Sequence, residues 1–154
     1  SHAAALGVDQ MVLIQDSHPE GAEEFEAFPE HCLTGSLEAR HVAELEAVPG
    51  FAGWQRFEKN SISALENTGL RAWLDARPRL RVLVAAGDVT DLCLYSLAVG
   101  LKLRSIAANL GQEVVVPANC VQTWDSPDHP GDLYHALFLR QLARNGVRVV
   151  REVR

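Results

Sequence analysis

Short apolar runs alternate along the chain with longer segments in which apolar residues recur at helical spacing. Five runs predict strands, at residues 10–15, 55–58, 81–86, 113–116 and 147–150. Three segments, at residues 68–76, 92–110 and 132–145, carry the periodicity of helices with one apolar face. The pair Asn145-Gly146 indicates where the last helix stops.

The order of these elements predicts an α/β fold. Runs that are apolar without alternation are typical of strands buried on both faces, and intervening helices are the usual connections of a parallel sheet. We therefore expect a three-layer α/β/α arrangement around a central parallel sheet. No repeat or linker interrupts the pattern, so residues 1–154 are interpreted as a single domain.

Composition narrows the class of function. A chain of 154 residues with 47% hydrophobic content can bury a core, and its net charge of −6 argues against binding to nucleic acid or to an anionic membrane surface. No apolar run is long enough to span a bilayer. Three scattered cysteines argue against a disulfide framework, so we expect a cytoplasmic protein.

Cys93 lies where the strand of residues 81–86 passes through the turn Gly87-Asp88-Val89-Thr90-Asp91-Leu92 into a helix. A helix N-terminus lowers the pKa of a thiol, so Cys93 is a candidate nucleophile. Backbone N–H groups of this turn are candidates for an oxyanion hole. The alternative is a buried cysteine that packs as a small apolar residue.

Polar residues after two other strands are further candidates. Asp16 and His18 share a face of an extended segment, and His31 follows in the next loop. One carboxylate and two imidazoles suit a catalytic divalent metal, although such residues also cap turns. Lys59 follows the strand of residues 55–58. It is either a solvated charge or a group that faces Cys93 and favours its thiolate.

Four ordered motifs resemble the isochorismatase-like cysteine hydrolases, and nicotinamidases in particular. They are Asp16-Ser17-His18-Pro19, the segment from Phe28 to Ser36, the segment from Lys59 to Leu65, and the turn from Gly87 to Cys93. The resemblance implies a metal-dependent amidohydrolase that converts nicotinamide to nicotinate and ammonia through a thioester, as in NAD salvage.

The resemblance also assigns roles to individual residues. Cys93 would be the nucleophile with Lys59 beside it, and the backbone N–H groups of Val89 and Cys93 would bind the oxyanion, next to a cis Asp88–Val89 peptide. The metal, usually zinc, would be held by Asp16, His18 and His31. Phe25 or Phe28 would wall the substrate ring.

Three departures from the family pattern affect these expectations. Ser17 replaces a bulkier residue and Phe28 replaces a tryptophan, and both changes bear on the substrate pocket. Family members begin with a strand that carries a catalytic aspartate, whereas residues 3–7 here resemble the end of the first helix. We therefore expect an upstream segment that supplies this aspartate.

Several alternatives stay open. The chain could hydrolyse another small amide or carbamoyl substrate, or it could be an inactive member that serves as a binding or assembly module. Members of the family often form homo-oligomers. For His129 and His135 we expect a helix cap or a surface position, with a substrate or interface role as the alternative.

Overall fold

The computed structural model describes residues 8–153 and divides the chain into two compact units, Ser1–Leu70 and Arg71–Arg154. The expected helix end at residues 3–7 lies outside the described residues.

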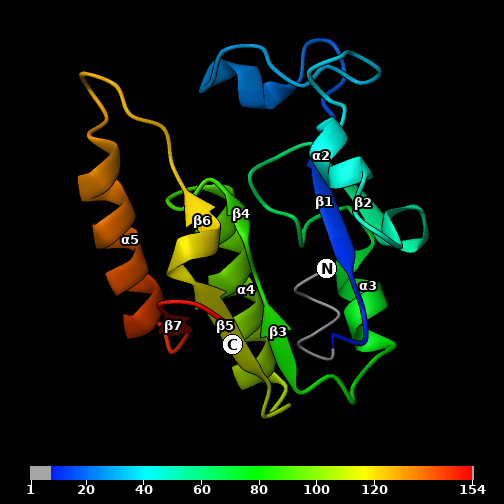
Figure 1. Ribbon diagram of the computed structural model, residues 1–154, viewed down its shortest axis with the longest axis vertical. Coiled ribbons are helices and arrows are strands. Elements are labelled where there is room, and N and C mark those ends of the chain that lie inside the picture. The colour runs from blue at the N-terminus through cyan, green and yellow to red at the C-terminus, as the bar shows by residue number, and fades with distance from the viewer. Residues whose placement is uncertain (1–7, 154) are drawn as a thin grey trace. The chain divides into compact units, whose positions relative to one another are not determined.

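The first unit contains a two-stranded parallel sheet (Figure 1). Strand β1 (Val12–Asp16) pairs with β2 (Gln55–Lys59), and the register runs from Val12 opposite Gln55 to Asp16 opposite Lys59. Short helical turns fill the connection between the strands: η1 (Glu23–Glu26), α2 (Ala43–Glu46) and η2 (Phe51–Gly53). Helix α3 (Leu70–Asp75) begins at the last residue of this unit. The parallel register places the carboxyl ends of both strands together, and with them Asp16 and Lys59.

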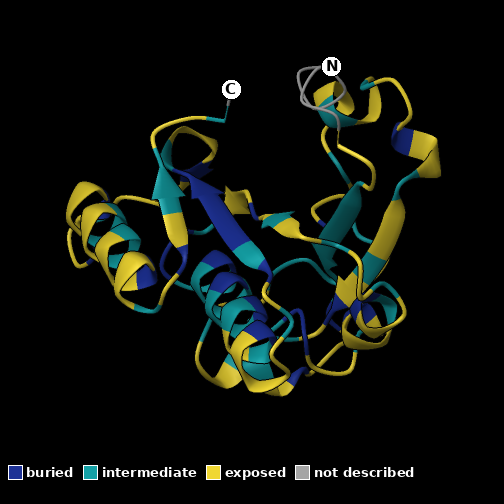
Figure 2. Cartoon of the chain, turned by 90° about the horizontal axis from the view of Figure 1, so that it is seen from below, coloured by how far each residue is buried: buried dark blue, intermediate teal, exposed yellow. Residues whose placement is uncertain are grey.

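The second unit contains a three-stranded parallel sheet with the order β3-β5-β7. Its strands are β3 (Val82–Val84), β5 (Glu113–Pro117) and β7 (Arg148–Val150), and its helices are α4 (Cys93–Ala107) and α5 (Gly131–Arg144). Helix α4 packs on β5, α5 packs on β7, and the two helices contact each other. Val114 and Val116 of β5, Ala98 of α4 and Leu142 of α5 are fully buried, so the core of this unit lies between the sheet and the helices (Figure 2).

A second, shorter parallel pair lies beyond the carboxyl end of β3. Strand β4 (Gly87–Asp88) pairs with β6 (Val121–Gln122), which follows the turn η3 (Ala118–Cys120). The run 81–86, expected as one strand, is thus shorter than predicted: β3 ends at Val84, the amide of Ala85 still donates to the carbonyl of Val115 at 2.9 Å, and β4 begins at Gly87. The strand β6 was not predicted from the sequence, because two residues give no periodicity.

The expected fold class is confirmed as α/β with parallel pairing. Burial is uneven, however. Strand β5 is almost completely covered, whereas Val82 and Val84 on β3 are 52% and 50% exposed. Among residues 8–153, no helix has both the length and the apolar character that a membrane span needs.

Candidate active site

The chain directly after β1 brings Asp16, His18 and His31 together. Asp16 is the last residue of β1, and the amide of Ser17 continues the ladder by donating to the carbonyl of Lys59 at 3.0 Å. The next segment then pairs with the loop that carries His31. His18 donates its amide to the carbonyl of Cys32 at 3.1 Å and accepts from the amide of Thr34 at 2.9 Å. This local pairing holds His31 beside His18, although the two residues belong to separate loops.

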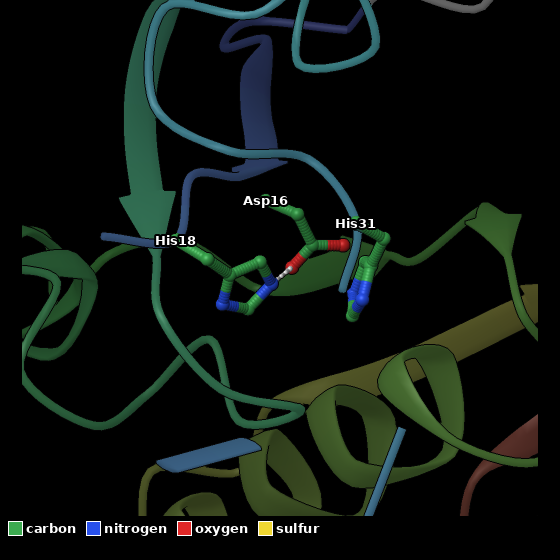
Figure 3. Close-up of side chains that lie close together, drawn as sticks. All are labelled: Asp16, His18 and His31. Carbon is green, nitrogen blue, oxygen red and sulfur yellow. Dashed lines mark ion pairs between the residues drawn. The ribbon is translucent and has the colours of Figure 1, made fainter. Parts of the chain in front are cut away.

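Figure 3 shows the Asp16 carboxylate close to both imidazole rings. One ligand atom from each of Asp16, His18 and His31 lies within 4.8 Å of the other two. The Nε2 atom of His18 is 3.6 Å from Oδ1 of Asp16, and the two ring centroids are 4.6 Å apart. These three residues form the Asp16 cluster, and they are the three candidate metal ligands predicted from the sequence.

Hydrogen bonds at the Nδ1 atoms set the tautomers of both rings. His18 Nδ1 is 2.9 Å from Oδ1 of Asn60, and His31 Nδ1 is 2.8 Å from the carbonyl of Pro29. Since both partners are oxygen acceptors, each Nδ1 carries the proton, and the Nε2 atom of each ring keeps its lone pair. Asn60 was not assigned a role from the sequence, because its partner lies 42 residues away.

The environment of His18 indicates that the Asp16 cluster fits a divalent metal. His18 is 0% exposed, and its Nε2 atom is buried without any hydrogen bond. A buried polar atom without a partner costs free energy, so such atoms are rare in folded proteins. A lone pair that is directed toward a carboxylate and a second imidazole suits a metal with three protein ligands and an open position.

Lys59 is buried beside the same carboxylate. It is 5% exposed, its Nζ forms an ion pair with Oδ1 of Asp16, and it donates to the carbonyl of Ser61 at 3.1 Å. Burial of an ammonium group is tolerated only when it is paired, so Asp16 compensates the charge of Lys59 and also belongs to the cluster. The assignment of Lys59 as a residue beside the thiol stays a prediction.

The aromatic residues near the Asp16 cluster differ in their contacts. The Phe25 ring lies 5.4 Å from that of His18 and 5.7 Å from that of His31, between centroids. Phe28 is half-buried and makes no ring contact with either histidine among the described residues. Phe25 is therefore better placed than Phe28 to wall a ligand at the cluster.

Cys32 follows His31 and is not a thiolate candidate. Burial raises the pKa of its thiol, and the charges of Asp16 and Glu38 raise it further, whereas Lys59 lowers it. A thiol with a raised pKa is mostly protonated near neutral pH and is a poor nucleophile. The remaining cysteines, Cys93 and the exposed Cys120, both belong to the second unit.

In the second unit Cys93 begins α4, as predicted. The carbonyl of Val89 accepts from the amides of Leu92 at 3.3 Å and Leu94 at 3.1 Å, which closes the turn tightly before the helix. The Asp88–Val89 peptide is cis, as the family resemblance implies. The roles of Val89 and Cys93 in binding an oxyanion stay predictions.

Two histidines contact the same turn, and this corrects the expectation for them. His129 is only 9% exposed and its Nε2 lies 2.7 Å from Oδ2 of Asp91, so it is neither a surface residue nor a helix cap. His135 is half-buried, and its Nδ1 lies 3.0 Å from the hydroxyl of Thr90. The partners are 38 and 45 residues apart, so no local pattern could have predicted either pair.

Comparison with known proteins agrees with this arrangement. The family model described as the isochorismatase domain matches residues 2–151, and so spans both units. The chain belongs to the isochorismatase family. No curated protein matches it.

Solved structures with the same fold include amide-cleaving enzymes by name. A nicotinamidase from Bacillus subtilis is 25% identical, with a TM-score of 0.74 over 96% of this chain and 78% of that one. A pyrazinamidase/nicotinamidase from Streptococcus mutans is 23% identical, with a TM-score of 0.77 over 97% of this chain and 79% of that one. An N-carbamoylsarcosine amidase from Thermoplasma acidophilum is 21% identical, with a TM-score of 0.73 over 97% and 76%. At this identity the structures establish the fold, and the family assignment makes the protein an isochorismatase-family hydrolase.

Proposed function

We propose that this protein is a metal-dependent cysteine amidohydrolase of the nicotinamidase type, which converts nicotinamide to nicotinate and ammonia. The observation that carries the proposal is the Asp16 cluster, with its buried and unpartnered His18 Nε2, in a chain of the isochorismatase family. Cys93 at the start of α4 supplies the second requirement, a nucleophile at a helix N-terminus.

In the proposed reaction, the Cys93 thiolate attacks the carboxamide carbon. The carbon–nitrogen bond then breaks, the nitrogen takes up a proton and leaves as ammonia, and a thioester links the acyl group to Sγ. Water attacks the thioester carbon, the carbon–sulfur bond breaks, and nicotinate is released as the thiol is regenerated. Backbone N–H groups of Val89 and Cys93 stabilise the oxyanion that forms in each half of the reaction.

Two charged residues complete the proposal. Lys59 is a buried ammonium, and it favours a nearby thiolate if it faces Cys93. The reaction also needs a general base that accepts the thiol proton, and the family resemblance assigns this role to an aspartate.

A divalent metal, zinc by preference for two imidazoles and a carboxylate, would be held by Asp16, His18 and His31 and would supply a Lewis-acid position for a substrate nitrogen or oxygen. Phe25 contacts both histidine rings and would lie against an aromatic substrate bound there. The side chain of Ser17, between the two cluster residues in sequence, bonds to the hydroxyl of Thr34 at 2.9 Å.

The test measures ammonia release from nicotinamide by the chain, together with any upstream segment that its reading frame encodes. Stripping of metal should abolish release, and zinc should restore it. The change Cys93→Ala should lower the rate by at least about 10⁴-fold, because it removes the nucleophile. Cys120→Ser is the matched control, since Cys120 is exposed and should not affect the rate. Turnover that survives Cys93→Ala would overturn the proposal.

A second substrate class is supported by one observation, the fold shared with an N-carbamoylsarcosine amidase. Loss of N-carbamoyl hydrolysis on Cys93→Ala, with no turnover of nicotinamide, would favour that class. No turnover of any small amide would instead favour an inactive member that serves as a binding or assembly module.

A further inference from the structure

His129 of the second unit is bonded through both ring nitrogens to oxygen acceptors. Its Nε2 lies 2.7 Å from Oδ2 of Asp91, and its Nδ1 lies 3.0 Å from the backbone carbonyl of Trp124. A carbonyl accepts only, and a carboxyl group is a much stronger acid than an imidazolium, so the proton of the Asp91 pair resides on the ring. His129 therefore donates from both nitrogens and carries a positive charge.

Two aromatic rings enclose this cation. The Trp124 ring is stacked on one side at 3.8 Å and that of Tyr134 on the other at 4.0 Å, between centroids. Aromatic faces attract cations, so the stack favours the protonated ring. Burial lowers the pKa of His129, but the hydrogen bonds to Asp91 and Trp124 and the charge of Asp91 outweigh it, so that the pKa is raised. The charged or titratable partners of the ring among the described residues are Asp91 and Tyr134.

The loop before α5 is built to hold this position. The amides of Ser126 and His129 donate to each other's carbonyls at 3.0 Å, which closes a tight turn. The side chain of Asp125 accepts from the amide of Gly131 at 2.8 Å and so caps the start of α5. A Cβ on Gly131 would lie 2.7 Å from the carbonyl oxygen of Trp124, so only glycine allows this close approach.

A second contact reaches the neighbouring residue of the same turn. Thr90 is 0% exposed, its amide donates to the carbonyl of Gln122 at 3.0 Å, and its hydroxyl bonds to Nδ1 of His135 on α5. Asp91 is 6% exposed, and its Oδ1 makes no hydrogen bond among the described residues, so His129 is its principal partner. Thr90 and Asp91 are the residues that lead to Cys93.

We propose that His129 and His135 are positioning residues for the nucleophile: the imidazolium of His129 holds Asp91, His135 holds Thr90, and together they fix the turn that presents the Cys93 thiol. This inference rests on the proposed role of Cys93. It gives residues 124–135 a role in positioning Cys93, although the two parts of the chain lie far apart in the sequence.

The test follows the reactivity of Cys93 and needs no substrate. In a background with Cys32→Ser and Cys120→Ser, the rate of alkylation by iodoacetamide is measured from pH 5 to 10. The change His129→Phe keeps a ring between Trp124 and Tyr134 but removes both donors. A turn that is no longer held should stabilise the thiolate less, so the midpoint of the profile should move up and the rate at pH 7 should fall about three- to tenfold.

Two controls separate position from charge and from stability. The double variant Asp91→Asn with His129→Phe removes both charges, and the shift should persist in it. Full recovery of the profile would mean that charge balance alone matters and would overturn the proposal. Leu142→Ala lowers stability from elsewhere in α5, where Leu142 is fully buried, and should leave the profile of the folded protein unchanged.

Two further measurements keep the proposal open to refutation if His129→Phe does not fold. Thr90→Val should slow alkylation, whereas Thr90→Ser, which keeps the hydroxyl, should retain most of the reactivity. In the unsubstituted chain, nitrogen NMR at pH 6.5 should find both ring nitrogens of His129 protonated in more than half of the molecules, because the pKa of His129 is raised above 6.5. A ring that is mostly neutral at this pH would contradict the proposal. Because none of these readouts uses nicotinamide, a missing amidase activity and a failed positioning role give different results.

Discussion

The chain holds two aspartate–histidine pairs, one in each unit, and they differ in how the second ring nitrogen is used. In the first unit His18 donates from Nδ1 to Asn60 and leaves a buried Nε2 without a hydrogen bond, 3.6 Å from Asp16. In the second unit both nitrogens of His129 meet acceptors, and Nε2 lies 2.7 Å from Asp91. The Nε2 atom of His18 therefore keeps a lone pair that can bind a metal, whereas neither ring nitrogen of His129 does.

The difference shows that residue type alone does not assign chemistry to such a pair. An imidazole that donates to an acceptor from one nitrogen has the other nitrogen available as a metal ligand, whereas an imidazole that donates from both nitrogens is a cation. The first suits a metal site, and the second suits an ion pair that holds backbone in place. The aspartates differ in the same way: Asp16 is shared with Lys59, whereas the only charged partner of Asp91 among the described residues is His129.

The largest expected effect compares the two histidines as metal ligands. His18→Ala should weaken zinc binding by more than about 100-fold, because loss of a direct ligand exceeds the effect of losing an outer partner. His129→Phe should leave zinc affinity unchanged, since neither of its nitrogens has a free lone pair. Competition with a chromophoric chelator measures both affinities, and circular dichroism checks that each variant folds. An equal loss of zinc affinity in the two variants would contradict the inference that His18, and not His129, binds the metal.

A smaller effect is expected at the residue that orients His18. Asn60→Leu removes the acceptor of the Nδ1 proton, so the ring loses its fixed tautomer, and zinc affinity should fall about 10- to 100-fold. Asn60→Asp is the matched variant, because a carboxylate still accepts that proton, and it should bind zinc at least as well as the unsubstituted chain. The same chelator competition applies. Similar affinities for Asn60→Leu and Asn60→Asp would show that the hydrogen bond to Nδ1 does not orient the ligand.

The sequence predicted the elements and the Asp16 cluster because both are encoded locally. Periodicity located the main strands and helices to within a few residues, and Asp16 and His18 lie two positions apart on one extended segment. The partners of the histidines were not predicted, since Asn60, Thr90 and Asp91 are 42, 45 and 38 residues from theirs. Only the parallel pairing of distant strands brings them together, and no short pattern records it.

The smallest expected effect is a dependence of stability on pH that belongs to the second pair alone. The pKa of His129 in the folded chain is raised above its ordinary value of 6.5. The protonated ring therefore stabilises the fold fully below about pH 6.5, and this contribution is lost as the pH rises through the raised pKa. Urea unfolding should accordingly show a midpoint that falls over this window in the unsubstituted chain. The double variant Asp91→Asn with His129→Phe has no such pair, so its midpoint should stay level there. A midpoint that rises with pH in the unsubstituted chain, or an equal fall in both proteins, would mean that the His129–Asp91 ion pair is not what stabilises the turn.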